Sequence, residues 1–235
     1  MSSKQVKMTL LFTLLAIVGG AQTPFNCNGG MYRVTENDNG STFQRIELDA
    51  ERGRIQFTDL ARFDGLPINA ICYRPQDDLV YGLVQTRPYQ LCRIDADYRL
   101  DILATLPLPD SLHFVSGDIS PDGKYLVMLG FHERSNYNLL ARINLTDPDY
   151  HTEMEIFRAQ GSTTRVYCTD IAFHPTTNVL FGFDHLQRRL VTIDLDNRVI
   201  DNTTYPQTGK IQGIVPSIFF DERGNLFGIG SAASL

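Results

Sequence analysis

Four oxygen-bearing side chains occupy equivalent places in four similar segments of this 235-residue chain: Asn69, Asp118, Asp170 and Ser217. Each stands at the start of a short apolar run, beside or one residue away from an isoleucine. Carboxylate, amide and hydroxyl oxygens are the ligands that Ca²⁺ prefers. If they converge, they would form the calcium site of a lactonase-like hydrolase. Alternatively, each side chain only hydrogen-bonds the exposed backbone at its own strand.

Other motifs that could carry chemistry are weak. No histidine has a partner at the H-x-x-x-H spacing typical of zinc sites, and no G-x-S-x-G nucleophile motif occurs. The run from Glu36 to Gly40 suggests a calcium loop, but Val34 stands where an EF-hand needs aspartate. His174 precedes a proline and is interpreted as a turn residue, and Asp184 and His185 are interpreted as a polar loop.

A second set of polar residues recurs once per segment, about a dozen residues further on. These residues are Glu47, Asp95, Asn144 and Asp194. The last three follow an alternating run of the Leu-x-x-Ile type, and Glu47 follows the related run Phe43–Ile46. Recurrence at the end of each such strand is what turn capping predicts, so we interpret these residues as caps and not as a carboxylate ring.

The four segments share an apolar strand, a turn rich in Pro, Asp, Asn or Gly, and a second apolar strand. They are Asn69–Leu83, Gly117–Leu129, Thr169–Phe183 and Pro216–Ile229. Their first-strand isoleucines lie 48, 52 and 47 residues apart. This period is typical of propeller blades. The near-continuous apolar second strands are expected to be covered on both faces.

A third, alternating strand and a fourth, more polar strand complete each repeat, which predicts an all-β fold of four-stranded antiparallel propeller blades. The N-terminal unit shows no clear first strand, and its strands are expected at Gly30–Val34, Phe43–Leu48 and Ile55–Leu60. The last unit has only Pro216–Phe220 and Leu226–Ile229. We therefore expect three full and two partial blades. One interpretation of the partial blades is a ring closed by pairing between the two ends of the chain. The favoured interpretation is that the chain is a piece of a longer protein.

The beginning of the chain predicts export. Residues 1–21 read as a secretory signal, with Lys4 and Lys7 before the apolar run Met8–Val18 and small residues at the expected cut. The run is too short for a membrane-spanning helix, and no later stretch is long and apolar enough for one. The propeller domain is expected at residues 22–235, secreted or at the cell surface. The net charge of −6 argues against a nucleic-acid partner.

Four cysteines allow three disulfide pairings: Cys27, Cys72, Cys92 and Cys168. No pair has the C-x-x-C spacing of a zinc or thiol redox site. Cys72 and Cys92 are predicted on the first and third strands of one sheet, which are not neighbours, so this bridge is disfavoured. Free buried thiols and bridges both stay open.

Three runs resemble known families. The segment from Thr169 to Asp194 and the turn "SPDGKYL" at Ser120–Leu126 are similar to blades of bacterial secreted propellers of the YVTN and TolB-like kinds. The run "AQTPFNCNGGMYRV" at residues 21–34 resembles an uncharacterised N-terminal propeller domain of large surface proteins of gliding-type bacteria. The matching residues belong to turns and strands, so the resemblance implies the fold and leaves the function open.

Two hypotheses follow. The first is a non-catalytic binding or scaffold module whose partner is an extracellular protein or glycan, with no cofactor. The second is the calcium-dependent lactonase-like hydrolase, with Asn69, Asp118 and Asp170 as the channel-rim ligands. The orientation of the two aspartates separates them: a shared metal-bridging position favours the enzyme, whereas capping of individual strands favours the binding module.

Overall fold

The computed structural model describes residues 22–26, 29–49, 54–209 and 214–230. Every regular element in these residues is a β-strand. The expected all-β propeller fold is confirmed. The predicted signal segment 1–21, Cys27 and the hairpin turn at residues 51–53 lie outside the described residues. No helix long and apolar enough to cross a bilayer occurs in the described part of the chain.

The strands form consecutive antiparallel sheets. The first sheet contains β1 (Met31–Asn37), β2 (Gly40–Asp49) and β3 (Arg54–Asp64), and the second contains β4 (Ile68–Arg74), β5 (Leu79–Val84), β6 (Gln90–Ile94) and β7 (Leu100–Thr105). The next strands are β8 (His113–Ile119), β9 (Tyr125–Phe131), β10 (Asn138–Asn144) and β11 (Thr152–Ala159), then β12 (Cys168–Phe173), β13 (Leu180–Asp184), β14 (Arg189–Asp194) and β15 (Val199–Asp201). The last two are β16 (Ser217–Phe220) and β17 (Leu226–Ile229).

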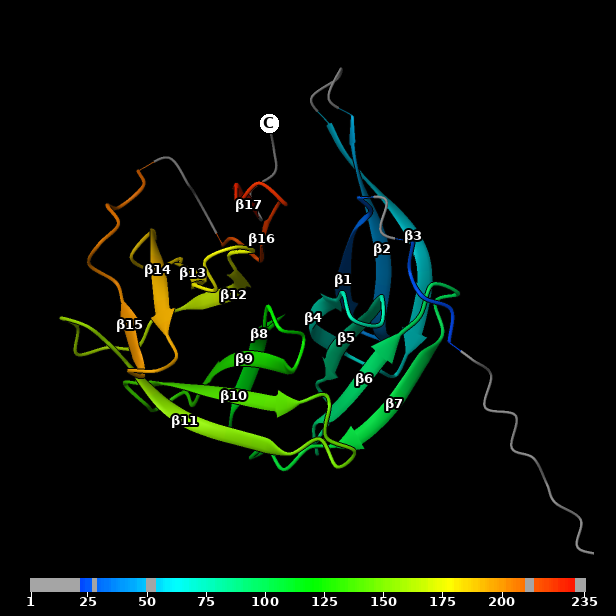
Figure 1. The fold of residues 1–235 in the computed structure, drawn as a ribbon, viewed down its shortest axis with the longest axis horizontal. Helices are drawn as coiled ribbons and strands as arrows, with labels where there is room; N and C mark the ends of the chain where they lie inside the picture. The colour runs from blue at the N-terminus through cyan, green and yellow to red at the C-terminus, as the bar shows by residue number, and fades with distance from the viewer. Residues whose placement is uncertain (1–21, 27–28, 50–53, 210–213, 231–235) are drawn as a thin grey trace, which may run out of the picture.

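The sheets are arranged radially. Figure 1 shows β1, β4, β8, β12 and β16 near a common centre, with the other strands of each sheet further out. Each inner strand packs against the inner strand of the next sheet. Four apolar clusters fill the spaces between successive sheets. Because the second strands lie inside these layers, all six residues of β5 are buried, whereas β7 at the rim is half-exposed.

Two details differ from the sequence expectation. The outer strands β11 and β15 pair in parallel through Arg158–Val199 and Ala159–Ile200, which joins two four-stranded units into one eight-stranded sheet. We call each of these two units, β8–β11 and β12–β15, a sheet. In the N-terminal unit, β1 packs against β4 and lines the central cavity. This strand therefore occupies the innermost place, where the sequence suggested that a first strand was missing.

The predicted turn caps are confirmed at three of four positions. Asp95 Oδ1 accepts the backbone N–H groups of Asp97 and Arg99 at 3.0 and 2.9 Å. Asn144 and Asp194 cap the turns that follow them in the same way. Glu47 lies inside β2, which continues to Asp49, and pairs with Gln56 in the sheet; the turn that follows lies outside the described residues.

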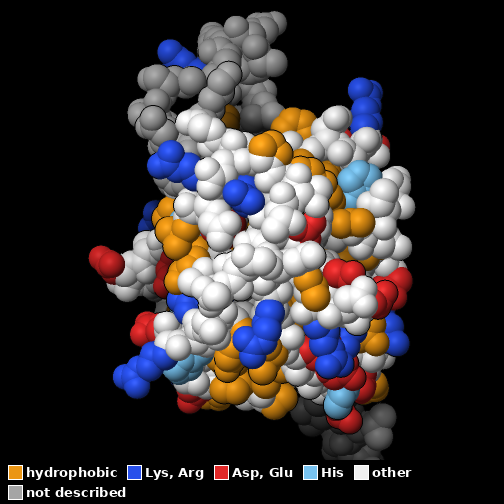
Figure 2. Space-filling model, turned by 90° about the vertical axis from the view of Figure 1, so that its left-hand side faces the viewer, with side chains coloured by type: hydrophobic (Ala, Val, Ile, Leu, Met, Phe, Trp, Pro, Cys, Tyr) orange, Lys and Arg blue, Asp and Glu red, His pale blue; other side chains and the backbone are white. Residues whose placement is uncertain are grey.

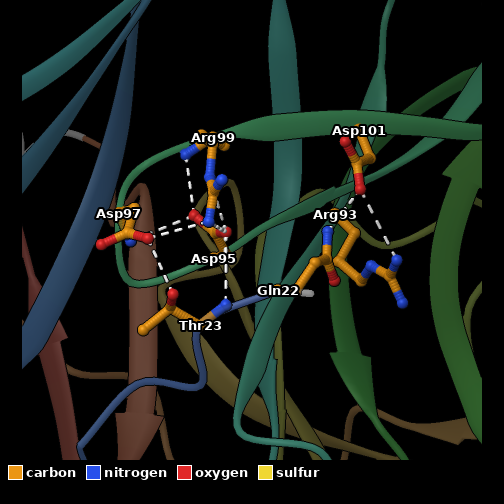
Figure 3. Close-up of polar contacts among 7 residues, drawn as sticks. All are labelled: Gln22, Thr23, Arg93, Asp95, Asp97, Arg99 and Asp101. Atoms are coloured by element: carbon orange, nitrogen blue, oxygen red, sulfur yellow. Dashed lines mark hydrogen bonds and ion pairs between the residues drawn. The ribbon is translucent and has the colours of Figure 1, made fainter. Parts of the chain in front are cut away.

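The segment Gln22–Asn26, here called the N-terminal strap, crosses the turn between β6 and β7 (Figure 3). Thr23 donates its hydroxyl to Asp97 at 2.7 Å and its carbonyl accepts the N–H of Ala96 at 2.8 Å. Gln22 donates to the carboxylate of Asp101, which also lies 3.6 Å from a nitrogen of Arg93. The strap thereby ties the chain that leads into β1 to the second sheet.

Phe25 anchors the strap from the apolar side. Its ring is 7% exposed and lies 5.3 Å from that of Tyr32, 6.3 Å from that of Phe43 and 6.5 Å from that of Tyr98, measured between centroids. Aromatic rings at such separations add to the energy of burial. The strap and the first two sheets therefore share one core.

Cys72, Cys92 and Cys168 are buried free thiols. Cys72 lies on β4 and Cys92 on β6, with β5 between them, so the disfavoured bridge is absent. The surface shown in Figure 2 intersperses acidic, basic and apolar side chains. No large field of one sign covers that face.

Candidate functional site in the central cavity

A cavity of about 790 Å³ lies where the inner strands meet. Its walls come from β1, β4, β8, β12 and β16. All four sequence candidates line it: Asn69, Asp118, Asp170 and Ser217. The four side chains therefore line one cavity, and the bonding of each side chain decides what the group can do.

Asp118 lies at the end of β8, just before the Ser120–Gly123 turn. Its Oδ1 accepts the N–H of Ile119 at 2.8 Å, within its own strand. Its Oδ2 accepts the N–H of Phe173, on the inner strand of the next sheet, at 2.7 Å. One carboxylate thus caps its own strand and connects two sheets.

Asp170 repeats this arrangement one sheet further on. Its Oδ1 accepts the N–H of Ile171 at 2.9 Å, and its Oδ2 accepts the N–H of Ile218 on β16 at 2.8 Å. The neighbouring Thr169 donates its hydroxyl to the carbonyl of Val215, which adds a second bond between the same two sheets. We call the Asp118 and Asp170 carboxylates, each with its two backbone donors, the inter-sheet latches.

Asn69 forms the local half of a latch. Its Oδ1 accepts the N–H of Ala70 at 2.8 Å. Ala70 has a left-handed backbone with φ of 51°, and the pairing of β4 with β5 shifts between Asn69 and Cys72. The pairing of β12 with β13 shifts in the same way between Cys168 and Ile171, around Asp170.

The surroundings disfavour charge on both aspartates. Burial raises the pKa of Asp118 to about 6, although the N–H groups of Phe173 and Ile119 favour the ionised form. Burial also raises the pKa of Asp170 well above its ordinary value, and the charge of Asp118 raises it further. The donors from Ile218, Ile171 and Ser217 counteract part of this increase. The two carboxylates therefore interact across the cavity.

Both oxygens of each latch already accept a backbone donor, and Asp170 also accepts a hydrogen bond from Ser217. No three histidine, cysteine, aspartate or glutamate side chains are grouped as a metal site in the described ranges. The other lining residues are largely apolar, among them Val115, Phe173 and Phe219. Asp221, Glu222, Arg33 and Arg223 also line the cavity, so the arrangement is that of a binding cavity in which the two latches are fixed acidic groups.

The polar-loop interpretation of Asp184 and the turn interpretation of His174 are both confirmed. Asp184 Oδ1 accepts the N–H groups of Leu186 and Gln187 at 3.0 and 3.2 Å. His174 Nδ1 accepts the N–H groups of Thr176 and Thr177, each at 3.3 Å. Both side chains therefore shape turns.

Sequence reasoning missed Arg165. Its side chain is 8% exposed and lies between the rings of Phe131 and Tyr167, 4.6 Å from each centroid. One terminal nitrogen donates to the carbonyls of residues 132, 133 and 135 at 3.0, 3.1 and 2.7 Å. Arg165 holds the loop between β9 and β10 in place, and no repeat pattern in the sequence marks it.

Comparisons agree with this architecture. The model of a family described as a repeat of unknown function (DUF6923) matches residues 31–231. No curated protein matches the chain. A protein of unknown function from Bacteroides thetaiotaomicron is 10% identical, with a TM-score of 0.57 over 89% of this chain and 53% of that one. A gluconolactonase from Xanthomonas campestris is 14% identical, with a TM-score of 0.54 over 86% of this chain and 65% of that one.

A hydrazine synthase of Kuenenia stuttgartiensis is 12% identical, with a TM-score of 0.50 over 86% of this chain and 68% of that one. The chain thus spans about half to two thirds of the length of these proteins. At this level of identity the likeness shows the fold alone, because one fold serves many chemistries.

Proposed function

This chain belongs to the family of repeats of unknown function DUF6923, and we propose that it is a non-catalytic propeller module that binds a protein or glycan ligand outside the cell. Export is supported by the basic start and the apolar run Met8–Val18. Placement in a large surface protein is supported by the resemblance of residues 21–34 to such proteins.

One observation carries the proposal: the two aspartates that would bind calcium in a hydrolase are used as latches. Each carboxylate accepts one donor from its own strand and one from the next sheet. A catalytic calcium ion needs several oxygens free to coordinate it and a bound water or substrate. Withdrawing these carboxylates toward a metal would break bonds between neighbouring sheets.

The lactonase-like hydrolase is the second candidate, because Asn69, Asp118, Asp170 and Ser217 do share one cavity. In that case Asn69, Asp118 and Asp170 would hold the calcium ion through their remaining lone pairs, and the ion would act as a Lewis acid toward the lactone carbonyl. The resemblance in fold to a gluconolactonase makes sugar lactones the substrates to test first.

The two functions are separated by measuring binding and turnover on the same preparation. Purified chain is applied to an array of glycans and extracellular proteins, and is incubated with glucono-δ-lactone with Ca²⁺ or with chelator. The binding module is supported by saturable binding of an arrayed glycan or protein without lactone turnover. It is refuted by lactone hydrolysis that requires Ca²⁺ and is lost in D118N and D170N, with D122N on the exposed Ser120–Gly123 turn as the matched control.

A further inference from the structure

β17, the last strand of the described chain, has one edge that pairs with no described strand, whereas the equivalent edge is paired in the other sheets. β17 pairs with β16 on one side, and no described strand pairs with its other side. The equivalent second strands β5, β9 and β13 are each paired on that side by a third strand. Among these equivalent strands, β17 differs because no described strand pairs with the main-chain groups of its outer edge.

Strands β13 and β17 have nearly the same sequence in different surroundings. β13 begins Leu-Phe-Gly-Phe and β17 reads Leu-Phe-Gly-Ile. In β13, Leu180 is 0% and Phe183 is 4% exposed, whereas in β17 both terminal residues are half-buried and Phe227 is 45% exposed. Residues of the same types are therefore buried in β13 and partly exposed in β17.

The residues that pack on β13 indicate what kind of strand would fit beside β17. β14 pairs Val191 with Gly182 and Ile193 with Leu180. A Cβ on Gly182 would lie 2.8 Å from Sγ of Cys168 and 3.3 Å from Val191, so the cysteine and the valine both pack over the glycine. Over Gly228 only the first of these places is filled by a described residue, Val215, 3.0 Å from the equivalent Cβ position. Tyr205, from the segment after β15, then lies 6.1 Å from Phe181 between ring centroids. The third strand thus places apolar residues over Leu180 and Gly182. Phe181 contacts both Tyr205, from the chain after the fourth strand, and Phe220 of β16, at 5.4 Å between ring centroids.

We propose that the outer edge of β17 binds a β-hairpin whose first strand has the alternating pattern Leu-x-x-Ile followed by Asp or Asn, as in β6, β10 and β14. An apolar β-branched residue of that strand would lie over Gly228, and an aliphatic residue would lie opposite Leu226. The returning strand and the segment after it would cover Phe227. Unpaired strand edges are the usual sites of such β-strand addition. This surface is separate from the central cavity and does not depend on what the cavity binds.

The probe is a synthetic peptide with the sequence of residues 187–201, which spans β14 and β15. Added to the full chain, the labelled peptide should bind saturably, and amide exchange at residues 226–229 should slow at least tenfold, while exchange in β13 stays unchanged. A control peptide with Val191→Asp and Ile193→Asp should bind at least tenfold more weakly, because it places carboxylates over Gly228 and Leu226.

Three results would overturn the proposal. The first is the absence of saturable binding up to about 1 mM peptide. The second is equal binding of the native and the Asp-substituted peptides. The third is strong protection of residues 226–229 without peptide that increases with protein concentration, together with dimers in sedimentation velocity. That outcome would assign the edge to a second copy of the chain.

Discussion

The substitution D118N should change how stability depends on pH. Asp118 has an ordinary pKa of 3.8 that burial raises to about 6 in the folded chain. The folded state therefore binds a proton more tightly than the unfolded state, so the free energy of unfolding decreases as pH rises from about 4 to about 6. This difference in pKa corresponds to about 3 kcal/mol when both states are fully ionised.

Asparagine removes the titration and keeps half of the latch. In D118N the amide oxygen would accept the N–H of Ile119, as Asn69 already does with Ala70 at 2.8 Å. The N–H of Phe173 loses its acceptor, which costs about 1–3 kcal/mol. Relative to the native chain, D118N should therefore gain about 3 kcal/mol in free energy of unfolding between pH 3.5 and 7.5. The decreased repulsion on Asp170 adds to the same difference.

The assay is urea unfolding across this pH range, followed by the fluorescence of the 10 tyrosines, because the chain has no tryptophan. D122N is the control, since hydrogen bonds from Ser120 and Lys124 lower the pKa of Asp122. Its removal should produce the opposite sign, with a relative loss of stability as pH rises. A difference between D118N and the native chain that does not vary with pH would refute the reasoning.

Three further predictions follow from buried groups. Replacing Arg165 with Met removes three hydrogen bonds to loop carbonyls and should lower the free energy of unfolding in urea by about 3 kcal/mol, with faster amide exchange in residues 132–135; unchanged exchange there would show that Arg165 does not hold this loop. D95N removes the ion pair of a carboxylate that is 1% exposed and that also accepts the N–H of Thr23 at 3.4 Å; it should cost about 1–3 kcal/mol and expose the N-terminal strap to limited proteolysis, whereas an uncut strap would show that its other contacts are enough to hold it. Cys72, Cys92 and Cys168 should resist a thiol reagent at pH 8 until denaturant is added, because burial raises the pKa of all three thiols, to about 12 for Cys92; labelling of the folded chain, located by mass spectrometry, would contradict it.

The sequence predicted the repeats well because their strands and turns are specified locally. The Ser120–Gly123 turn contains a proline, an aspartate and a glycine whose φ is 69°, and these residues favour a turn in any context. The place of β1 could not be predicted in the same way. Its sequence resembles neither first strand nor second strand strongly, and its inner position depends on packing against β4.

The candidate site shows the same division between local and long-range information. The equivalence of Asn69, Asp118 and Asp170 could be recognised from the repeat alone, and so could the bond of each side chain to its own strand. The second acceptor of each aspartate is used by a residue 55 or 48 positions away, on the next sheet. This partner depends on how sheets stack, which is a property of the assembled ring.

The latches give a physical reason why acidic residues recur around a cavity in which their charge is unfavourable. Ile119 and Ile171 each present a backbone N–H beside the aspartate of their own strand, and Phe173 and Ile218 on the neighbouring inner strands each present another. A single carboxylate satisfies both donors, which asparagine cannot do because its amide nitrogen is a donor itself. Burial in this position raises the pKa of Asp118 and Asp170, and the bonds to Phe173 and Ile218 hold successive sheets together. A ligand that took these carboxylates as its own would have to supply replacement acceptors for Phe173 and Ile218, and this requirement favours ligands that contact the latches from the cavity without displacing them.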